Sequence, residues 1–215
     1  MKNLCLLLAT IVLFSFTVKE NNIPNHNNTQ QEDADQNSND KKFLLDYFQQ
    51  TSDALLENVK GLSEAEMQYK PSPEKWSISQ CLEHIVLTEA MLFKNTKELL
   101  AKPANPERKE EVKVADQEII DGMSSRSTKV KAPKELQPEG KYVSPEVALS
   151  DLNGQRAEIL KLIKKTSEED LRNHITDSPF GPVDAYHSLL YIAGHVARHT
   201  SQIKEVKADP GFPSE

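Results

Sequence analysis

Four segments of this chain carry apolar residues at steps of three and four positions, and this spacing constrains the fold more than any other feature. Apolar side chains at these steps lie along one face of an α-helix. The segments are residues 41–59, 78–100, 145–163 and 183–207. Only 7 of the 215 residues are glycine, fewer than a β-rich fold with many left-handed turns needs. The pattern therefore predicts an all-α chain with four long helices.

The ends of these segments carry helix-boundary signals. Ser77 is followed three residues later by Gln80, as in a capping box, and Ser144 precedes Pro145, a residue favoured at the first helical position. Residues 103–144 contain four prolines and many charged side chains, and within them residues 114–123 are expected to form a short helix. Four long helices with one long crossover connection describe a four-helix bundle.

The N-terminus does not resemble the rest of the chain. Residues 1–19 contain Lys2 followed by a mostly apolar run of the length of a secretory signal, short of a membrane-spanning helix. They predict a signal peptide and an extracytoplasmic protein, periplasmic or secreted, with no stable membrane insertion after cleavage; an uncleaved anchor is the alternative. Residues 20–40 are rich in Asn, Gln and Asp, which predicts a disordered spacer. The folded domain is expected over residues 41–210.

Charge and cysteine content exclude several classes of protein. The formal net charge is −7, and nucleic-acid binding requires clustered positive charge. The two cysteines, Cys5 and Cys81, cannot form a disulfide framework, and Cys81 lies in an apolar stripe, which favours a core position over a ligand role. The expected partner is a small-molecule substrate, and a homodimer stays open.

Three histidines form a pattern that core packing does not explain. His195 and His199 are four residues apart, so their rings lie on one helix face, on the flank of the apolar stripe. His84 occupies the matching flank of residues 78–100. Three neutral imidazoles suit a divalent ion, zinc or nickel above all, and leave one coordination position open. The alternative is a chance pair of exposed histidines.

Two stretches resemble the DinB-like superfamily of bacterial four-helix bundles: YKPSPEKWSISQCLEHI at residues 69–85 and GHVARHTSQI at residues 194–203. The likeness covers about residues 41–207. It implies a divalent metal on His84, His195 and His199, and Gln202 matches the usual glutamine after the histidine pair. The family includes thiol-dependent transferases and isomerases as well as hydrolases, so the resemblance does not fix the reaction.

The sequence leaves the catalytic residues unassigned. Four charged residues are candidates for a general base or a partner of the ligating imidazoles: Glu83, Glu89, Asp184 and Arg198. His187 is expected on the surface, His174 in a turn, and His26 in the spacer. Gly194 is expected to permit a close helix contact. The specificity of the pocket for its substrate is expected to come from residues 103–144 and the first helix.

Three functions fit these observations. A divalent-metal-dependent hydrolase uses the open coordination position for water or substrate. A thiol-dependent S-transferase places a thiolate there instead, although low-molecular-weight thiols belong mainly to the reducing cytosol. A non-catalytic metal-binding module is the third.

Overall fold

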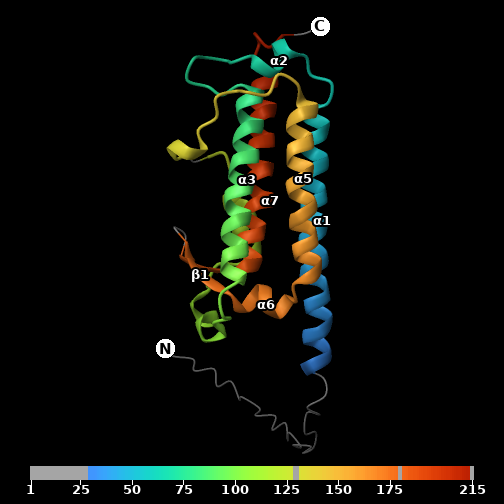
Figure 1. The fold of residues 1–215 in the computed structure, drawn as a ribbon, viewed down its shortest axis with the longest axis vertical. Coiled ribbons are helices and arrows are strands. Elements are labelled where there is room, and N and C mark those ends of the chain that lie inside the picture. Colours follow the sequence, from blue (N-terminus) through green and yellow to red (C-terminus); the bar gives the residue numbers. More distant parts are fainter. Residues whose placement is uncertain (1–28, 128–130, 179–180, 214–215) are drawn as a thin grey trace, which may run out of the picture.

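Four long helices form the body of the protein. The computed structural model describes residues 29–127, 131–178 and 181–213. The helices α1 (Thr29–Val59), α3 (Ile78–Leu100), α5 (Pro145–Lys165) and α7 (Ala185–Lys207) lie side by side (Figure 1). Contacts join α1 to α7, α7 to α3, α3 to α5 and α5 to α1. The predicted four-helix bundle is confirmed.

The long connection between α3 and α5 runs the length of the bundle, because both helices point in the same direction (Figure 1). It contains a 3₁₀ turn, η1 (Pro106–Glu111), a short helix, α4 (Asp116–Ser124), and a second turn, η2 (Lys134–Leu136). At its start, Asn105 N donates to Asn173 O over 2.8 Å, and near its end Gly140 N donates to Glu83 Oε2 over 2.6 Å. The predicted crossover and its short helix are both present.

Smaller elements join the remaining helices. The short helix α2 (Glu64–Gln68) precedes α3, and α6 (Glu168–Asn173) follows α5. An antiparallel pair, β1 (Ile175–Ser178) and β2 (Gly181–Asp184), adds two short strands that were not predicted to an otherwise helical fold. Because Val183 and Asp184 belong to β2, the last helix begins at Ala185, two residues later than predicted.

The first helix begins earlier than expected. Residues 29–40, predicted as part of the disordered spacer, are helical. The helix is anchored at its junction with the domain, where Tyr186 Oη donates to Asp40 O over 2.9 Å and Lys41 N donates to Glu168 Oε1 over 3.0 Å. Extension of an anchored helix gains one hydrogen bond per residue without a new nucleation cost. The predicted signal peptide, the rest of the spacer and His26 lie outside the described residues.

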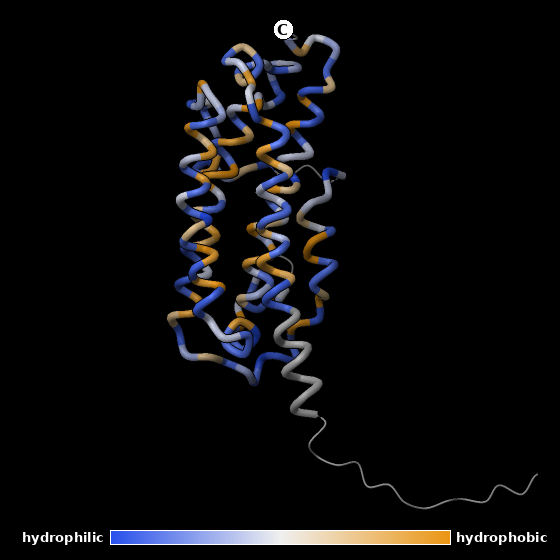
Figure 2. Tube along the Cα trace, turned by 90° about the vertical axis from the view of Figure 1, so that its right-hand side faces the viewer, coloured by the Kyte–Doolittle hydropathy of each residue, from blue (hydrophilic) through white to orange (hydrophobic). Residues whose placement is uncertain are grey.

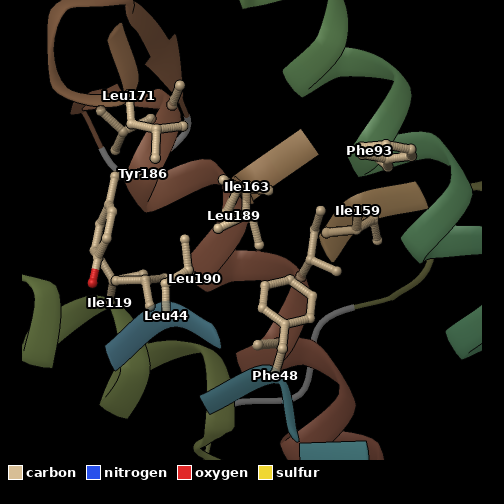
Figure 3. Packing of buried hydrophobic residues seen from close by; sticks show 14 of the residues in the cluster. Leu44, Phe48, Phe93, Ile119, Ile159, Ile163, Leu171, Tyr186, Leu189 and Leu190 are labelled. Atoms are coloured by element: carbon tan, nitrogen blue, oxygen red, sulfur yellow. The ribbon is translucent and has the colours of Figure 1, made fainter. Parts of the chain in front are cut away.

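Apolar stretches recur along each long helix between hydrophilic ones (Figure 2), and they pack into two clusters. The first includes Leu44, Phe48, Ile159 and Leu189, whose side chains gather between the helices in Figure 3. The second includes Leu55, Ile85, Val196 and Cys81. Cys81 is fully buried, as its place in the stripe predicted. None of the described helices is long and apolar enough to cross a membrane.

A buried ion pair lies where the two clusters meet. Arg156 of α5 donates from Nε to Glu89 Oε2 of α3 over 3.2 Å, and from Nη1 to Phe48 O of α1 over 2.9 Å. Along α3 and α5, the apolar residues on one side of this pair belong to the first cluster and those on the other side to the second. The pair therefore ties three helices together in the middle of the bundle.

Candidate metal centre

Three histidines from two helices converge at one point. His84 of α3 and His195 and His199 of α7 are buried, and their ligand nitrogens all lie within 4.8 Å of one another. The ring centroids are 5.0 Å apart for His84 and His195, 4.7 Å for His84 and His199, and 4.4 Å for His195 and His199. The structure thus brings together the residues predicted as ligands.

The start of α3 sets the position of His84. Ser77 Oγ accepts from Gln80 N over 3.2 Å, and Gln80 Oε1 accepts from Ser77 N over 3.1 Å, which completes the predicted capping box. Trp76, the residue before the cap, lies against the site, with its ring 4.8 Å from that of His84 and 5.9 Å from that of His199. The cap therefore fixes both the first turn of the helix and the aromatic wall of the site.

A glycine allows α4 to approach the histidine helix. A Cβ atom at Gly194 would lie 2.8 Å from Met123 Cβ, which is closer than side-chain carbons pack. The close helix contact expected at Gly194 is confirmed, with α4 as the partner. This contact brings Met123 to the side of α7 that carries His195.

Hydrogen bonds orient two of the three imidazoles. His84 Nδ1 donates to Leu136 O over 2.7 Å, and His199 Nδ1 donates to Gln202 Oε1 over 2.9 Å. Because a neutral imidazole carries one N–H, these bonds leave the Nε2 lone pairs of both rings unprotonated. Such partners raise the basicity of a ligating histidine and fix its orientation.

Burial favours the neutral form of all three rings. Desolvation lowers the pKa of His84, and desolvation together with the charges of His84 and Arg198 lowers the pKa of His195 to about 3. The pKa of His199 is also depressed well below its usual value, first by burial and then by the neighbouring histidines. Metal binding requires neutral imidazole, so protons compete weakly for these nitrogens.

The donor set fits a tetrahedral divalent ion. Nitrogens bound to zinc at about 2.0–2.1 Å in tetrahedral geometry lie ~3.3 Å apart. His195 Nε2 and His199 Nε2 are 3.1 Å apart. Among the described residues, the cluster contains histidines only, so one coordination position remains for water or substrate.

A cavity of about 740 Å³ opens onto the three histidines. Its wall includes Trp76 and Met91, and its far side is formed by residues of the long connection. Pockets for small molecules typically have volumes of about 300–1,000 Å³. Of the segments expected to set specificity, the long connection contributes lining residues between 122 and 126 and between 131 and 138, but none of the lining residues that the structure describes comes from α1.

The predicted acidic candidates serve the fold instead of the site. Glu83 Oε2 accepts backbone N–H bonds from Glu139, Gly140 and Lys141. Glu89 is paired with Arg156.

Asp184 caps α7 by accepting from His187 N over 2.7 Å. Of the four charged candidates, Arg198 alone lines the cavity.

The remaining histidines have structural roles. The prediction that His187 lies on the surface is wrong: it is 2% exposed, and its Nε2 lies 2.8 Å from Asp116 Oδ1 of α4. The helix α4 packs over His187, and the pattern of apolar residues in α7 does not predict this contact. His174 is buried, with its ring nitrogens 2.7 Å from Asp170 O and 3.1 Å from Lys102 O.

Two groups of the site were not predicted from the sequence: the carbonyl of Leu136, which accepts from His84, and Arg126, which contacts Gln202. A backbone acceptor has no side-chain signature, and Arg126 follows α4 in an aperiodic stretch. Arg126 Nη1 donates to Gln202 Oε1 over 3.1 Å, so it holds the same amide that orients His199. The available sequence signal for this part of the site was Gln202 itself, which matches the usual glutamine after the histidine pair.

Replacing Gln202 by alanine is expected to weaken zinc binding by about 10–100-fold, the usual cost of losing the partner of a ligating histidine. A competition titration against a chromophoric chelator measures the change. Gln49→Ala is the matched control, because Gln49 is an exposed residue of α1 that bonds Asp53. Equal affinity of Gln202→Ala and the control would contradict the assigned role.

Comparisons with known proteins agree with the family and the fold. The family model described as the DinB superfamily matches residues 47–203. The uncharacterized protein YuaE of Bacillus subtilis (strain 168) is 28% identical over 149 residues, which are 69% of this chain and 88% of that protein. Among solved structures, YfiT from Bacillus subtilis superimposes with a TM-score of 0.56 at 12% identity, covering 80% of this chain and 89% of its own. YfiT is described as a probable metal-dependent hydrolase with an unusual four-helix bundle topology.

Proposed function

Because this chain belongs to the DinB superfamily, we propose that it is a divalent-metal-dependent hydrolase built on His84, His195 and His199. The observation that carries the proposal is the convergence of three buried neutral imidazoles at the floor of a cavity. The description of YfiT as a probable metal-dependent hydrolase supports the same reaction class. Zinc and nickel are the ions that this donor set favours.

The residues of the chain have separate tasks in this proposal. The three imidazoles present nitrogen lone pairs to the ion, while Leu136 O and Gln202 Oε1 hold two of the rings in orientation. Trp76 covers His84 and His199 and keeps bulk water from that side. When bound, the ion would polarise a substrate oxygen and lower the pKa of water toward ~7.

Export of the protein stays a prediction from residues 1–19, which lie outside the described residues. An extracytoplasmic location would favour hydrolysis over thiol transfer, because low-molecular-weight thiols are kept mainly in the cytosol.

Zinc-loaded or nickel-loaded protein is expected to hydrolyse at least one member of a panel of esters and amides. Chelation should abolish turnover, and added metal should restore it. His199→Ala should fall to the rate of the metal-free protein, because two imidazoles hold a divalent ion poorly, whereas His26→Ala should keep the rate. Initial rates at matched protein concentration measure this.

Other outcomes would contradict a hydrolase. Turnover confined to thiol-transfer substrates would identify an S-transferase. Metal binding without turnover across both panels would identify a binding module. Equal hydrolysis by His199→Ala and the wild-type protein would place the reaction elsewhere.

A further inference from the structure

We propose that the cavity takes a substrate that carries a carboxylate or phosphate group beside an apolar portion, and that Arg198 and Arg126 hold its anionic end. The inference rests on the proposed function, since it names the substrate class of the same site. It comes from the distribution of charge around the cavity and from the apolar character of the rest of its wall.

Arg198 lies beside the metal ligands. It follows His195 by three residues and precedes His199 by one, so its side chain shares the helix face of His195. It lines the cavity together with both histidines. Arg126 lines the same cavity, and its Nη1 donates over 3.1 Å to Gln202 Oε1, which also accepts from His199 Nδ1 over 2.9 Å. Both guanidinium groups therefore belong to the cavity that contains the three histidines.

Positive charge is concentrated here although the chain as a whole carries −7. Among the described residues that line the cavity, four are basic and one is acidic: Lys75, Arg126, Lys131 and Arg198 against Glu74. Glu205 also lies close by, with its carboxylate 2.9 Å from Arg126 Nη2. The charges of Arg126, Lys75 and Arg198 all lower the pKa of Glu205, so several cations share this one carboxylate.

The two guanidinium groups repel each other. Both line the same cavity, and the nearby carboxylate of Glu205 is already paired with Arg126. A divalent ion bound by His84, His195 and His199 would add two further positive charges to the same cavity. An anionic ligand group relieves this repulsion, and a cavity with walls of low dielectric constant focuses such a field on the incoming ligand. Arginine suits the role because its planar donors match carboxylate and phosphate oxygens.

Much of the rest of the wall is apolar. Trp76, Met91, Met123, Leu136 and Pro133 line it, and they can cover an apolar body while the arginines hold the charged end. A fully charged ligand such as a bare polyphosphate would leave these side chains without a partner. The wall therefore favours an amphipathic small molecule.

The test uses the single tryptophan of the chain, Trp76, as a reporter inside the cavity. Metal-free and zinc-loaded protein are titrated with phenylacetate, phenylphosphonate and the neutral phenylacetamide, followed by tryptophan fluorescence and by calorimetry. At least one anion should bind metal-free protein about 10-fold or more tightly than the amide, because hydrogen bonds to charged groups are strong. The preferred anion distinguishes a carboxylate from a phosphate substrate.

Arg198→Gln should remove most of this preference, and Arg198→Lys should keep part of it. Arg108→Gln is the matched control, because Arg108 pairs with Glu111 and Asp177 and does not line the cavity. Circular dichroism checks that each variant is folded, and Arg126→Gln replaces Arg198→Gln if that variant is not.

Equal affinity for the three probes, no saturable binding of either anion, or an unchanged preference in folded Arg198→Gln would overturn the proposal. The binding assay needs no turnover. Anion preference without hydrolysis would therefore contradict the proposed reaction alone, and hydrolysis without anion preference would contradict the substrate class alone.

Discussion

Replacing Arg156 by alanine is expected to lower the free energy of unfolding by about 3–5 kcal/mol, because breaking a buried ion pair leaves an uncompensated charge. The guanidinium is 5% exposed and the Glu89 carboxylate 1%. Arg156 also donates to Phe48 O and Ser52 Oγ of α1, so the variant loses contacts between three helices. Chemical denaturation measures the loss.

The loss should depend on pH. Burial raises the pKa of Glu89 to about 7, and the charge of Arg156 partly offsets this rise. In the unfolded chain a glutamic acid has a pKa of about 4.3. The protonated carboxyl therefore contributes stability that is present below the unfolded pKa and is lost as pH rises through about 7. Arg156→Ala should cost more at pH 8, where the buried Glu89 must either ionise without a partner or take up a proton, than at pH 5, where it is already protonated.

Two controls separate the buried pair from a general charge effect. Arg108→Ala should cost far less than Arg156→Ala, because exposed ion pairs contribute little to stability. The double replacement Glu89→Leu with Arg156→Met should recover most of the stability, because well-packed apolar residues often match a buried ion pair. A loss below about 1 kcal/mol in Arg156→Ala would mean that water reaches the junction of the two apolar clusters.

Removal of the metal is expected to leave the helices intact and to lower the melting temperature. Binding to the folded state alone stabilises by about 2.7 kcal/mol at a free ion concentration of 100 Kd, which corresponds to about 5–10 °C for a domain of this size. The two apolar clusters that hold the bundle do not include the three histidines, so the apoprotein should stay folded. Circular dichroism with and without zinc measures both quantities.

The same experiment distinguishes the kinds of metal site. In His84→Ala, zinc should no longer raise the melting temperature, whereas His174→Ala should keep the response whatever its own stability. Loss of helical signal on chelation would indicate a structural site. An unchanged melting temperature in the wild-type protein would indicate that the histidines hold no ion.

Local sequence signals sufficed to predict the helices and the meeting of the three histidines. The capping box at Ser77 and the proline after Ser144 mark the starts of α3 and α5. The shared flank positions of His84, His195 and His199 follow from helical periodicity, because neighbouring helices of a bundle bring such flanks together.

The features that sequence analysis missed depend on contacts between distant segments. His187 is buried because Asp116 of α4 lies against it, and no pattern within α7 indicates that contact. Glu89 was a candidate near the site, but its partner, Arg156, lies 67 residues away. The strands β1 and β2 have four residues each, which is too short for a clear alternation of apolar and polar residues.

The central claim is that His84, His195 and His199 hold one divalent ion with a coordination position left open. X-ray absorption at the zinc edge, on protein reconstituted and then freed of excess metal, tests it most directly. The expected result is one zinc per chain with three imidazole nitrogens at about 2.0–2.1 Å and light oxygen ligands, lost in His195→Ala. A sulfur ligand at about 2.3 Å, or an absence of bound zinc in the wild-type protein, would contradict the claim.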